Sequence, residues 1–232
     1  LIFESSGTSG STSSRHFVKS KAVYEESFLR AFEQFYGNPS QYCILGLLPS
    51  YLERGNSSLV YMVQKLVEIS GHTESGFFLS DTERLKKKLL ENEAKGQKTL
   101  LAGVTYALLD FASANPLSLK HTIVMETGGM KGRKKEMTRH EVHDLLKTKL
   151  GLQQIHSEYG MTELLSQAYA KKDGIFETTP WMQVLLRSED DPFELVQYND
   201  IEKSATGAIN IIDLANLYSC AFIATDDMGK LY

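Results

Sequence analysis

The sequence predicts an α/β fold in which helices cover a mainly parallel sheet and a β-rich lobe follows at the C-terminal end. From residue 17 to residue 171, short apolar runs typical of buried strands alternate with longer segments whose apolar residues recur at helical spacing. Short connections between such segments imply right-handed crossovers and parallel strands. After Asp173-Gly174 the helical spacing ends and β-type runs follow. We therefore predict an α/β core over residues 1–174 and a β-rich lobe of the same large domain over residues 175–232.

The individual elements follow from apolar patterns and from the residues that flank them. Capping boxes at residues 80–83 and 138–141 begin two charged helices, because their hydroxyl and carboxylate side chains can satisfy free backbone N–H groups. The predicted helices lie within residues 17–36, 58–69, 80–96, 105–115, 138–151 and 163–171. The predicted strands of the core are 42–48, 76–79, 99–104, 121–125 and 153–157, and those of the lobe are 181–186, 195–198, 208–212 and 221–224.

Composition excludes several classes of protein. With 42% hydrophobic and 23% charged residues, the 232-residue chain resembles an ordinary soluble globular protein. Its net charge of -4 argues against a nucleic-acid partner, which usually requires a basic surface. The chain has no apolar run long enough for a membrane span, and from residues 1–4 we expect no signal peptide. Cys43 and Cys220 are far apart and form no metal pattern, so we expect two free core thiols and a cytoplasmic location.

Two local clusters of ionisable residues are better explained by solvation than by chemistry. His140 and His143 lie three positions apart on a predicted helix, but they lack the zincin spacing and a third ligand, so we expect a solvated helix face. The basic run at residues 131–135 could steer a phosphate, although such a loop is more often merely exposed. A hydrolase is not indicated, because no Gly-x-Ser-x-Gly motif is present.

The segment at residues 4–14 consists almost entirely of serine, threonine and glycine. Glycines allow the backbone to approach a ligand closely, and exposed N–H groups and hydroxyls together can hold a polyphosphate. It is not a Walker A loop, because the nearest lysine is Lys19. Composition alone favours the other interpretation, a flexible linker at the chain terminus.

A second informative segment, residues 155–163, follows the last predicted strand of the core. The carboxyl ends of parallel strands are where open α/β sheets bind ligands. Tyr159 can offer a flat face to a base and Gly160 permits close approach. Thr162 adds a hydroxyl, and Glu163 a carboxylate suited to Mg²⁺. For this segment alone, a capped helix with a core tyrosine is an equally good interpretation.

Taken together, these segments resemble the adenylate-forming superfamily of acyl-CoA synthetases, luciferases and peptide-synthetase adenylation domains. Ser6-Gly7-Thr8-Ser9-Gly10 stands where that family has its phosphate loop, and residues 159–163 read as its Tyr-Gly-x-Thr-Glu motif. Gly128-Gly129 resembles its adenine-pocket glycine pair, residues 207–211 its Gly-Glu-Leu strand, and residues 224–229 its Thr-Gly-Asp segment. Several motifs in the family's order are far more specific than any one of them.

Within the superfamily, the chain is most similar to acyl-protein synthetases of the bacterial bioluminescence fatty-acid reductase type (LuxE-like). This similarity rests on the sequence segments at residues 46–52, 158–164 and 212–216. It implies a ligase that uses ATP and Mg²⁺ to convert a carboxylic acid, here a fatty acid, into an acyl-adenylate. The acyl group would then pass to a protein thiol and onward to a reductase partner.

The resemblance also implies a role for each matching residue. Ser6, Gly7, Thr8, Ser9 and Gly10 would hold the β- and γ-phosphates of ATP. Gly128, Gly129 and Tyr159 would frame the adenine, and Asp227 would hold the ribose. Thr162 would contact the α-phosphate, and Glu163 would bind Mg²⁺, so that these two residues are the expected catalytic pair. We expect residues 5–10, Gly128, Tyr159, Glu163 and Asp227 to converge on one cleft.

Three departures from the family pattern leave other functions open. The phosphate loop has no lysine, with Arg15 as a possible substitute, and Ser157 replaces the usual asparagine before the tyrosine motif. We also expect a chain truncated at both ends, without the C-terminal lid of the superfamily or the acyl-accepting cysteine. A ligase that transfers to coenzyme A or a carrier protein therefore stays open, as does a non-catalytic nucleotide-binding module.

Overall fold

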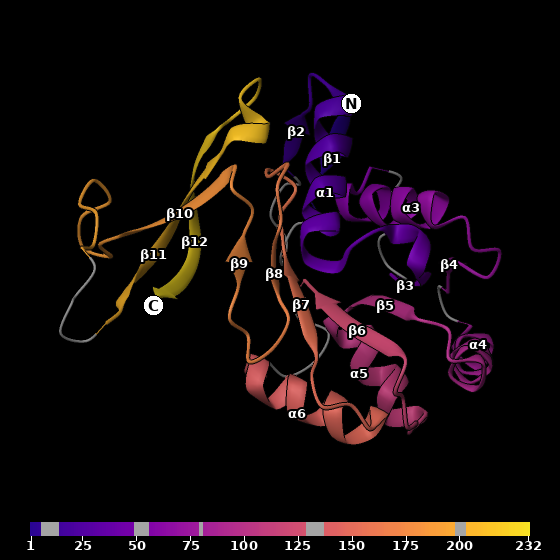
Figure 1. Ribbon diagram of the computed structural model, residues 1–232. Coiled ribbons are helices and arrows are strands. Elements are labelled where there is room, and N and C mark those ends of the chain that lie inside the picture. The colour runs from indigo at the N-terminus through magenta and orange to yellow at the C-terminus, as the bar shows by residue number, and fades with distance from the viewer. Residues whose placement is uncertain (6–13, 49–55, 79–80, 129–136, 198–202) are drawn as a thin grey trace.

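The computed structural model describes residues 1–5, 14–48, 56–78, 81–128, 137–197 and 203–232. At its centre is a seven-stranded sheet with the strand order β4-β3-β5-β6-β7-β8-β9 (Figure 1). The first five strands in that order are parallel, whereas β8 pairs antiparallel with β7, and β9 pairs antiparallel with β8. The strands are β3 Cys43–Leu47, β4 Gly76–Phe77, β5 Thr99–Val104, β6 Thr122–Thr127, β7 His156–Tyr159, β8 Ala168–Ala170 and β9 Glu177–Thr178. The predicted α/β fold with a mainly parallel sheet is confirmed.

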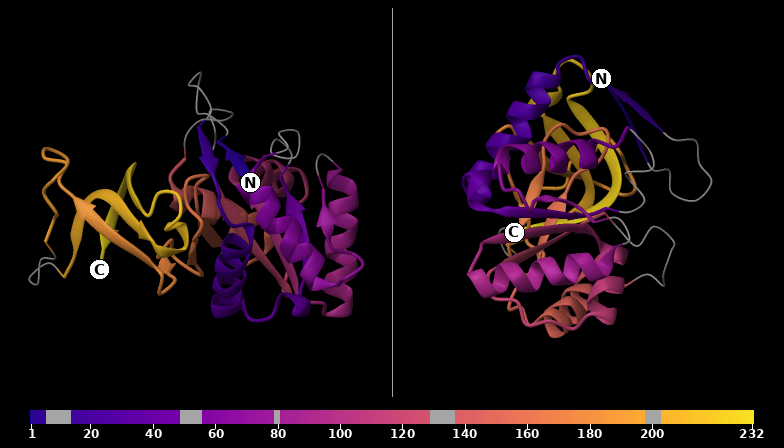
Figure 2. Two further views of the ribbon diagram at one scale, coloured as in Figure 1. Left: turned by 90° about the horizontal axis from the view of Figure 1, so that it is seen from above. Right: turned by 90° about the vertical axis from the view of Figure 1, so that its right-hand side faces the viewer.

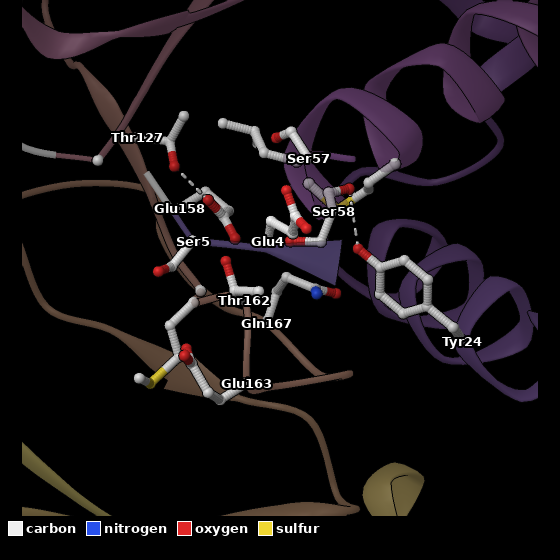
Figure 3. A pocket seen from close by; sticks show the side chains of 15 residues that line it. Glu4, Ser5, Tyr24, Ser57, Ser58, Thr127, Glu158, Thr162, Glu163 and Gln167 are labelled. Atoms are coloured by element: carbon white, nitrogen blue, oxygen red, sulfur yellow. Dashed lines mark hydrogen bonds between the residues drawn. The ribbon is translucent and has the colours of Figure 1, made fainter. Parts of the chain in front are cut away.

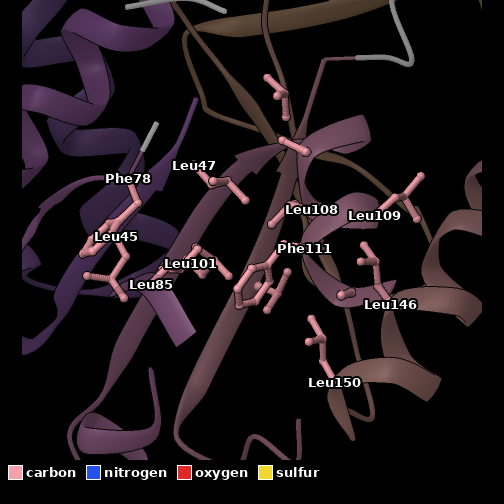
Figure 4. Close-up of a cluster of buried hydrophobic side chains, with 14 of the residues drawn as sticks. Leu45, Leu47, Phe78, Leu85, Leu101, Leu108, Leu109, Phe111, Leu146 and Leu150 are labelled. Atoms are coloured by element: carbon pink, nitrogen blue, oxygen red, sulfur yellow. The ribbon is translucent and has the colours of Figure 1, made fainter. Parts of the chain in front are cut away.

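Helices cover both faces of this sheet. Helices α1 (Lys21–Tyr36) and α3 (Ser58–Ser70) pack on one face through a cluster that includes Tyr24 and Phe28. Helices α4 (Thr82–Lys95), α5 (Thr105–Ala114) and α6 (Arg139–Leu150) cover the other face through leucines and Phe111 (Figure 4). The predicted capping box at Thr138 and Glu141 is present at the start of α6. A short 3₁₀ helix, η1 (Pro39–Gln41), precedes β3.

A separate antiparallel sheet lies beside the α/β layers (Figure 2). It consists of β10 (Met182–Arg187), β11 (Ala205–Asp213) and β12 (Phe222–Leu231), in that order. A 3₁₀ helix, η2 (Leu214–Asn216), follows β11. Near the N-terminus, β1 (Ile2–Glu4) and β2 (Arg15–Phe17) form a two-stranded antiparallel sheet. The predicted β-rich C-terminal region is therefore present. The division of the chain at residues 174 and 175 stays a prediction.

The predicted helix at residues 163–171 is wrong. A turn at residues 162–163 follows β7, and the chain then returns as β8, antiparallel to β7. The buried carboxylate of Asp213 accepts hydrogen bonds from the backbone N–H groups of Leu165 and Ser166, at 2.8 and 3.0 Å. These donors are satisfied by a residue far along the chain, so the local helical spacing of apolar side chains does not decide the structure.

Three smaller predictions also need correction. The cap of α4 is Asp81, whose side chain accepts the N–H of Arg84, whereas Ser80 lies outside the described residues. The strand predicted at residues 195–198 is, within its described part, one isolated bridge between Leu195 and Arg187. Cys43 and Cys220 are free as predicted, but Cys220 is exposed, because it lies in the turn between η2 and β12 and not in a core strand.

A membrane-spanning helix needs about 20 predominantly apolar residues. Among the described helices, none meets this requirement.

Replacing Asp213 by alanine should destabilise the protein by about 3 kcal/mol, because its fully buried carboxylate is the acceptor for three backbone N–H groups and the Ser166 hydroxyl. Chemical denaturation should show a lower midpoint. The exposed Asp190 gives a matched control, and Asp190→Ala should leave the midpoint unchanged within about 0.5 kcal/mol. Equal effects of the two substitutions would contradict this role of Asp213.

Candidate active site

A pocket of about 250 Å³ opens where the parallel strands β6 and β7 end (Figure 3). Its walls come from four parts of the chain: the β1 end, α1, the start of α3, and the strand ends with the turn after β7. The lining residues are Glu4, Ser5, Tyr24, Ser57, Ser58, Leu59, Met62, Thr127, Gly128, Glu158, Gly160, Met161, Thr162, Glu163 and Gln167. The pocket therefore lies at the edge where ligands bind to open α/β sheets.

Glu163 joins the turn after β7 to the N-terminal hairpin. Its Oε1 accepts a hydrogen bond from the hydroxyl of Ser14, the first described residue after residues 6–13. Its backbone carbonyl accepts from Nδ2 of Asn216 at 2.7 Å. The Glu163 carboxylate is thus held beside the end of the hydroxyl-rich segment, with part of its surface accessible to solvent.

A buried acid lies deeper in the pocket. Glu158 on β7 accepts a hydrogen bond from the Thr127 hydroxyl on β6. Burial raises the pKa of Glu158 from the usual 4.5 to about 7, despite that hydrogen bond. Gly160 leaves the space that this side chain occupies, since a Cβ at Gly160 would lie 2.5 Å from Glu158 Oε1. The glycine is therefore required for close approach and not for an unusual backbone angle.

The strand ends are tied together by a second buried carboxylate, that of Glu126 on β6. It accepts from Thr105 at 2.8 Å and from Ser157 at 2.6 Å, and Arg139 Nε lies 3.4 Å away. His143 Nε2 lies 3.1 Å from Ser157 Oγ and 3.6 Å from Glu126 Oε1. Burial by itself would raise the pKa of Glu126, but the hydrogen bonds from His143, Ser157 and Thr105 hold it below the usual value.

This arrangement corrects the prediction that both helix histidines are solvated. His140 is exposed, but His143 is buried, because it faces β7 and Glu126. The same cluster also positions Gly128. The Thr105 hydroxyl lies 2.8 Å from the carbonyl oxygen of Gly128, whose φ of +64° favours glycine.

Tyr159 and Asp227 come together beside the pocket, although 68 residues separate them in the sequence. The Tyr159 hydroxyl donates to Asp227 Oδ2 at 2.7 Å, and Asp227 is exposed. Burial, together with the hydrogen bond to Asp227, raises the pKa of Tyr159 well above its usual range. The phenol therefore remains a donor, and it orients a carboxylate that is open to solvent.

The predicted site residues fall into three groups. Gly128, Thr162 and Glu163 line the pocket, and Tyr159 contacts Asp227 next to it. The predicted phosphate-loop residues Ser6, Gly7, Thr8, Ser9 and Gly10, and also Gly129, lie outside the described residues.

Glu158, Gln167 and Thr127 were not predicted as pocket residues. The position of Glu158 directly before the Tyr159 motif was the one available signal for it, and Gln167 gave no signal.

The described residues include no group of three or more His, Cys, Asp or Glu side chains that could hold a metal ion by themselves. Mg²⁺ does not require such a group when a phosphate is present, because it is commonly bound by one or two carboxylates, substrate phosphates and water. The accessible Glu163 carboxylate fits this mode of binding.

The chain matches no protein-family model and no curated protein. Solved structures do match it. The ATP-bound RpMatB-BxBclM chimera B1 has a TM-score of 0.68 and 16% identity over 99% of this chain and 45% of that chain. O-succinylbenzoate coenzyme A synthetase (MenE) from Bacillus subtilis, in complex with ATP and magnesium ion, has a TM-score of 0.64 and 14% identity over 99% and 47%. The N-terminal subdomain of NpsA from Klebsiella oxytoca has a TM-score of 0.61 and 13% identity over 98% and 59%.

These likenesses establish the fold, which this chain shares with the chimera, with the coenzyme A synthetase and with the N-terminal subdomain of NpsA. The chain spans about half the length of the structures it matches.

The buried acid predicts a pH-dependent stability. Because the folded state raises the pKa of Glu158 from 4.5 to about 7, the folded protein keeps a proton that the unfolded chain releases. Raising the pH through this window charges a buried carboxylate, so stability falls. Glu158→Gln should remove this loss, with a gain over the parent that grows to about 3 kcal/mol near neutral pH.

Thermal unfolding at a series of pH values measures the difference. Glu33→Gln, at an exposed position of α1, is the control and should follow the parent at every pH. A Glu158→Gln curve that stays parallel to the parent would contradict the assignment.

Proposed function

We propose that this chain is the nucleotide-binding part of a ligase that activates a carboxylic acid with ATP, forming an acyl-adenylate and pyrophosphate. One observation carries the proposal. Thr162, Glu163 and Gly128 line one pocket at the strand ends, and Glu163 contacts Ser14 at the end of the hydroxyl-rich segment. The fold agrees, since the chain is similar to an ATP-bound chimera and to a coenzyme A synthetase in complex with ATP and magnesium ion.

The proposed roles follow from chemistry and position. Glu163 would hold Mg²⁺ near the phosphates, and the bound ion would neutralise charge on the phosphate oxygens. Thr162 would donate to the α-phosphate, and residues 6–10 would hold the β- and γ-phosphates. A carboxylate oxygen of the acid would attack the α-phosphorus, and the bond from that phosphorus to the bridging oxygen would break as pyrophosphate leaves. The protein contributes mainly position and charge stabilisation.

The nucleoside would lie on the side of the pocket where Tyr159 and Asp227 meet. Gly128, Gly129 and the Tyr159 ring would frame the adenine, and the Asp227 carboxylate would accept hydrogen bonds from the ribose hydroxyls. The hydrogen bond from Tyr159 leaves one Asp227 oxygen free of that contact and fixes the orientation of the carboxylate. The pair is thus suited to a vicinal diol.

We further propose that the acid is a fatty acid and that its acyl group passes to a protein thiol. This proposal rests on the resemblance to acyl-protein synthetases. Transfer to coenzyme A or to a carrier protein is the alternative within the same chemistry. A nucleotide-binding module without turnover is the other candidate, and one observation favours it: no lysine or arginine is found among the described residues that line the pocket.

Glu163→Gln tests the catalytic role. Glutamine keeps the shape and an acceptor for Ser14 but lacks the negative charge that would hold Mg²⁺. Acyl-adenylate formation by the whole protein should fall by about two orders of magnitude, roughly 2.7 kcal/mol, and added Mg²⁺ should restore part of it. The measurement is pyrophosphate release with a fatty acid, ATP and a Mg²⁺ series.

Glu177→Gln, at an exposed position of β9, is the matched control and should behave as the parent. The melting temperature of Glu163→Gln without nucleotide should barely move. Parental activity of Glu163→Gln at limiting Mg²⁺ would place the metal site elsewhere.

Asp227→Asn tests the ribose contact. ATP affinity measured by calorimetry should fall about tenfold, because the carboxylate would lose charge-assisted hydrogen bonds to the hydroxyls. The adjacent, exposed Asp226 provides the control, and Asp226→Asn should bind ATP as the parent does. With 2′,3′-dideoxy-ATP, the parent and Asp227→Asn should have similar affinities. If Asp227→Asn loses the same factor with both nucleotides, Asp227 does not contact the ribose.

A further inference from the structure

The amide of Gln167 is an unusual feature of the pocket. Its side chain lines the cavity, the residue is 4% exposed, and its Oε1 has no hydrogen-bond partner. Among the described residues, the other buried side-chain atom without a partner is Thr179 Oγ1, and Thr179 does not line this pocket. Buried polar groups in folded proteins are nearly always paired, so an orphan acceptor at a ligand pocket indicates a partner supplied by the ligand.

Gln167 does not act alone, because Glu158 lies beside it. A Cβ built at Gly160 would lie 2.5 Å from Glu158 Oε1 and 3.7 Å from Gln167 Cγ. Both side chains therefore pack over the same glycine, one from β7 and the other from the residue before β8 (Figure 3). The Glu158 carboxyl and the Gln167 amide thus both reach the pocket from beside this glycine.

The charges of the lining residues also favour a ligand that donates hydrogen bonds. The described lining residues include three carboxylates, those of Glu4, Glu158 and Glu163, and no lysine, arginine or histidine. Glu4 is paired with Arg15 at 3.0 Å, and Glu163 accepts from Ser14. Glu158 accepts a hydrogen bond from the Thr127 hydroxyl through Oε2. A second donor at this place would come from a bound molecule.

Glu158 and Thr127 also border an apolar cavity beneath α1 and α3, with Phe32, Met62 and Leu66 in its wall. That space is small, about 20 Å³, but Leu59 and Met62 also line the main pocket, so an acid bound there would contact apolar side chains as well as Glu158 and Gln167.

We propose that Glu158 and Gln167 form a specificity-determining pair, which selects a carboxylic acid bearing a hydrogen-bond donor, a hydroxyl or an ammonium group, on an otherwise apolar chain. This inference rests on the proposed adenylate-forming function and specifies its substrate. An unsubstituted acid would exclude water from Gln167 Oε1 and leave this acceptor unpaired, which is the situation in which polar sites discriminate most strongly.

The test compares hexanoic acid with its 2-, 3- and 6-hydroxy and 2-, 3- and 6-amino derivatives as substrates of the whole protein. Pyrophosphate release with ATP and Mg²⁺ gives kcat/KM for each. We expect at least one donor-bearing acid to exceed hexanoic acid about tenfold or more. In Gln167→Leu this preference ratio should collapse toward one. Gln183→Leu, at an exposed position of β10, is the control and should keep the parental ratio.

Two further measurements separate this role from a merely structural one. Gln167→Leu should raise the melting temperature of the ligand-free protein, because it removes an unpaired buried acceptor. Gln167→Met serves the same purpose should leucine fit poorly. Glu158→Gln distinguishes the two donors in assays at alkaline pH, where the Glu158 carboxyl is ionised, since it should there weaken an ammonium-bearing acid much more than a hydroxy acid.

Ligand-observed NMR of the same acids measures binding without turnover. If no acid releases pyrophosphate but donor-bearing acids bind the parent and not Gln167→Leu, the proposed function fails and the specificity pair stands. If hexanoic acid is activated and bound as well as every derivative, or if Gln167→Leu lowers all acids by one factor, the specificity pair is overturned while adenylation stands.

Discussion

The buried carboxylate of Glu126 is the interaction on which the geometry of the pocket depends. A charge inside a protein is tolerated when hydrogen bonds and opposite charges compensate its lost hydration. Here the donors come from the start of α5, from β7 and from α6, so satisfying one side chain aligns three neighbouring elements. The Thr105 hydroxyl also contacts the Gly128 carbonyl. The residues that compensate the charge of Glu126 therefore also position Gly128 at the rim of the pocket.

Asp213, on β11 of the antiparallel sheet, is a second buried carboxylate that positions neighbouring segments. Its carboxylate accepts the N–H groups of Leu165 and Ser166, while the neighbouring Asn216 donates to the Glu163 carbonyl. The turn that presents Thr162 and Glu163 is thus held by β11 and η2 and not by the sheet from which it leaves. Neither Glu126 nor Asp213 lines the pocket. They position the residues that do, which explains why two charged side chains are buried in the middle of the fold.

Local sequence patterns were sufficient to predict the parallel core. They were insufficient where residues distant in the sequence supply the hydrogen-bond partners. Strands such as β5 and β6 are apolar runs between turn residues, and the Thr138 capping box satisfies its own helix, so neighbouring residues determine both. The segment at 163–171 has helical spacing, but Asp213 takes its backbone donors and makes it a turn and a strand. His143 was wrongly predicted to be solvent-exposed, because its partners Glu126 and Ser157 are distant from it in the sequence.

The candidate site likewise contains residues that a local motif predicts and residues that only the tertiary structure brings into place. Thr162, Glu163 and Gly160 belong to one short motif, so the sequence indicates them directly. Gln167 acquires its place from the antiparallel return of β8, which the sequence did not predict, and its proximity to Glu158 exists because Gly160 has no side chain. Both residues oppose stability, one as an unpaired acceptor and the other as an acid whose pKa burial raises to about 7. Buried residues that lower the stability of the ligand-free protein are expected in binding sites, where a ligand supplies the missing partners. The pocket between β7 and α3 has two such residues.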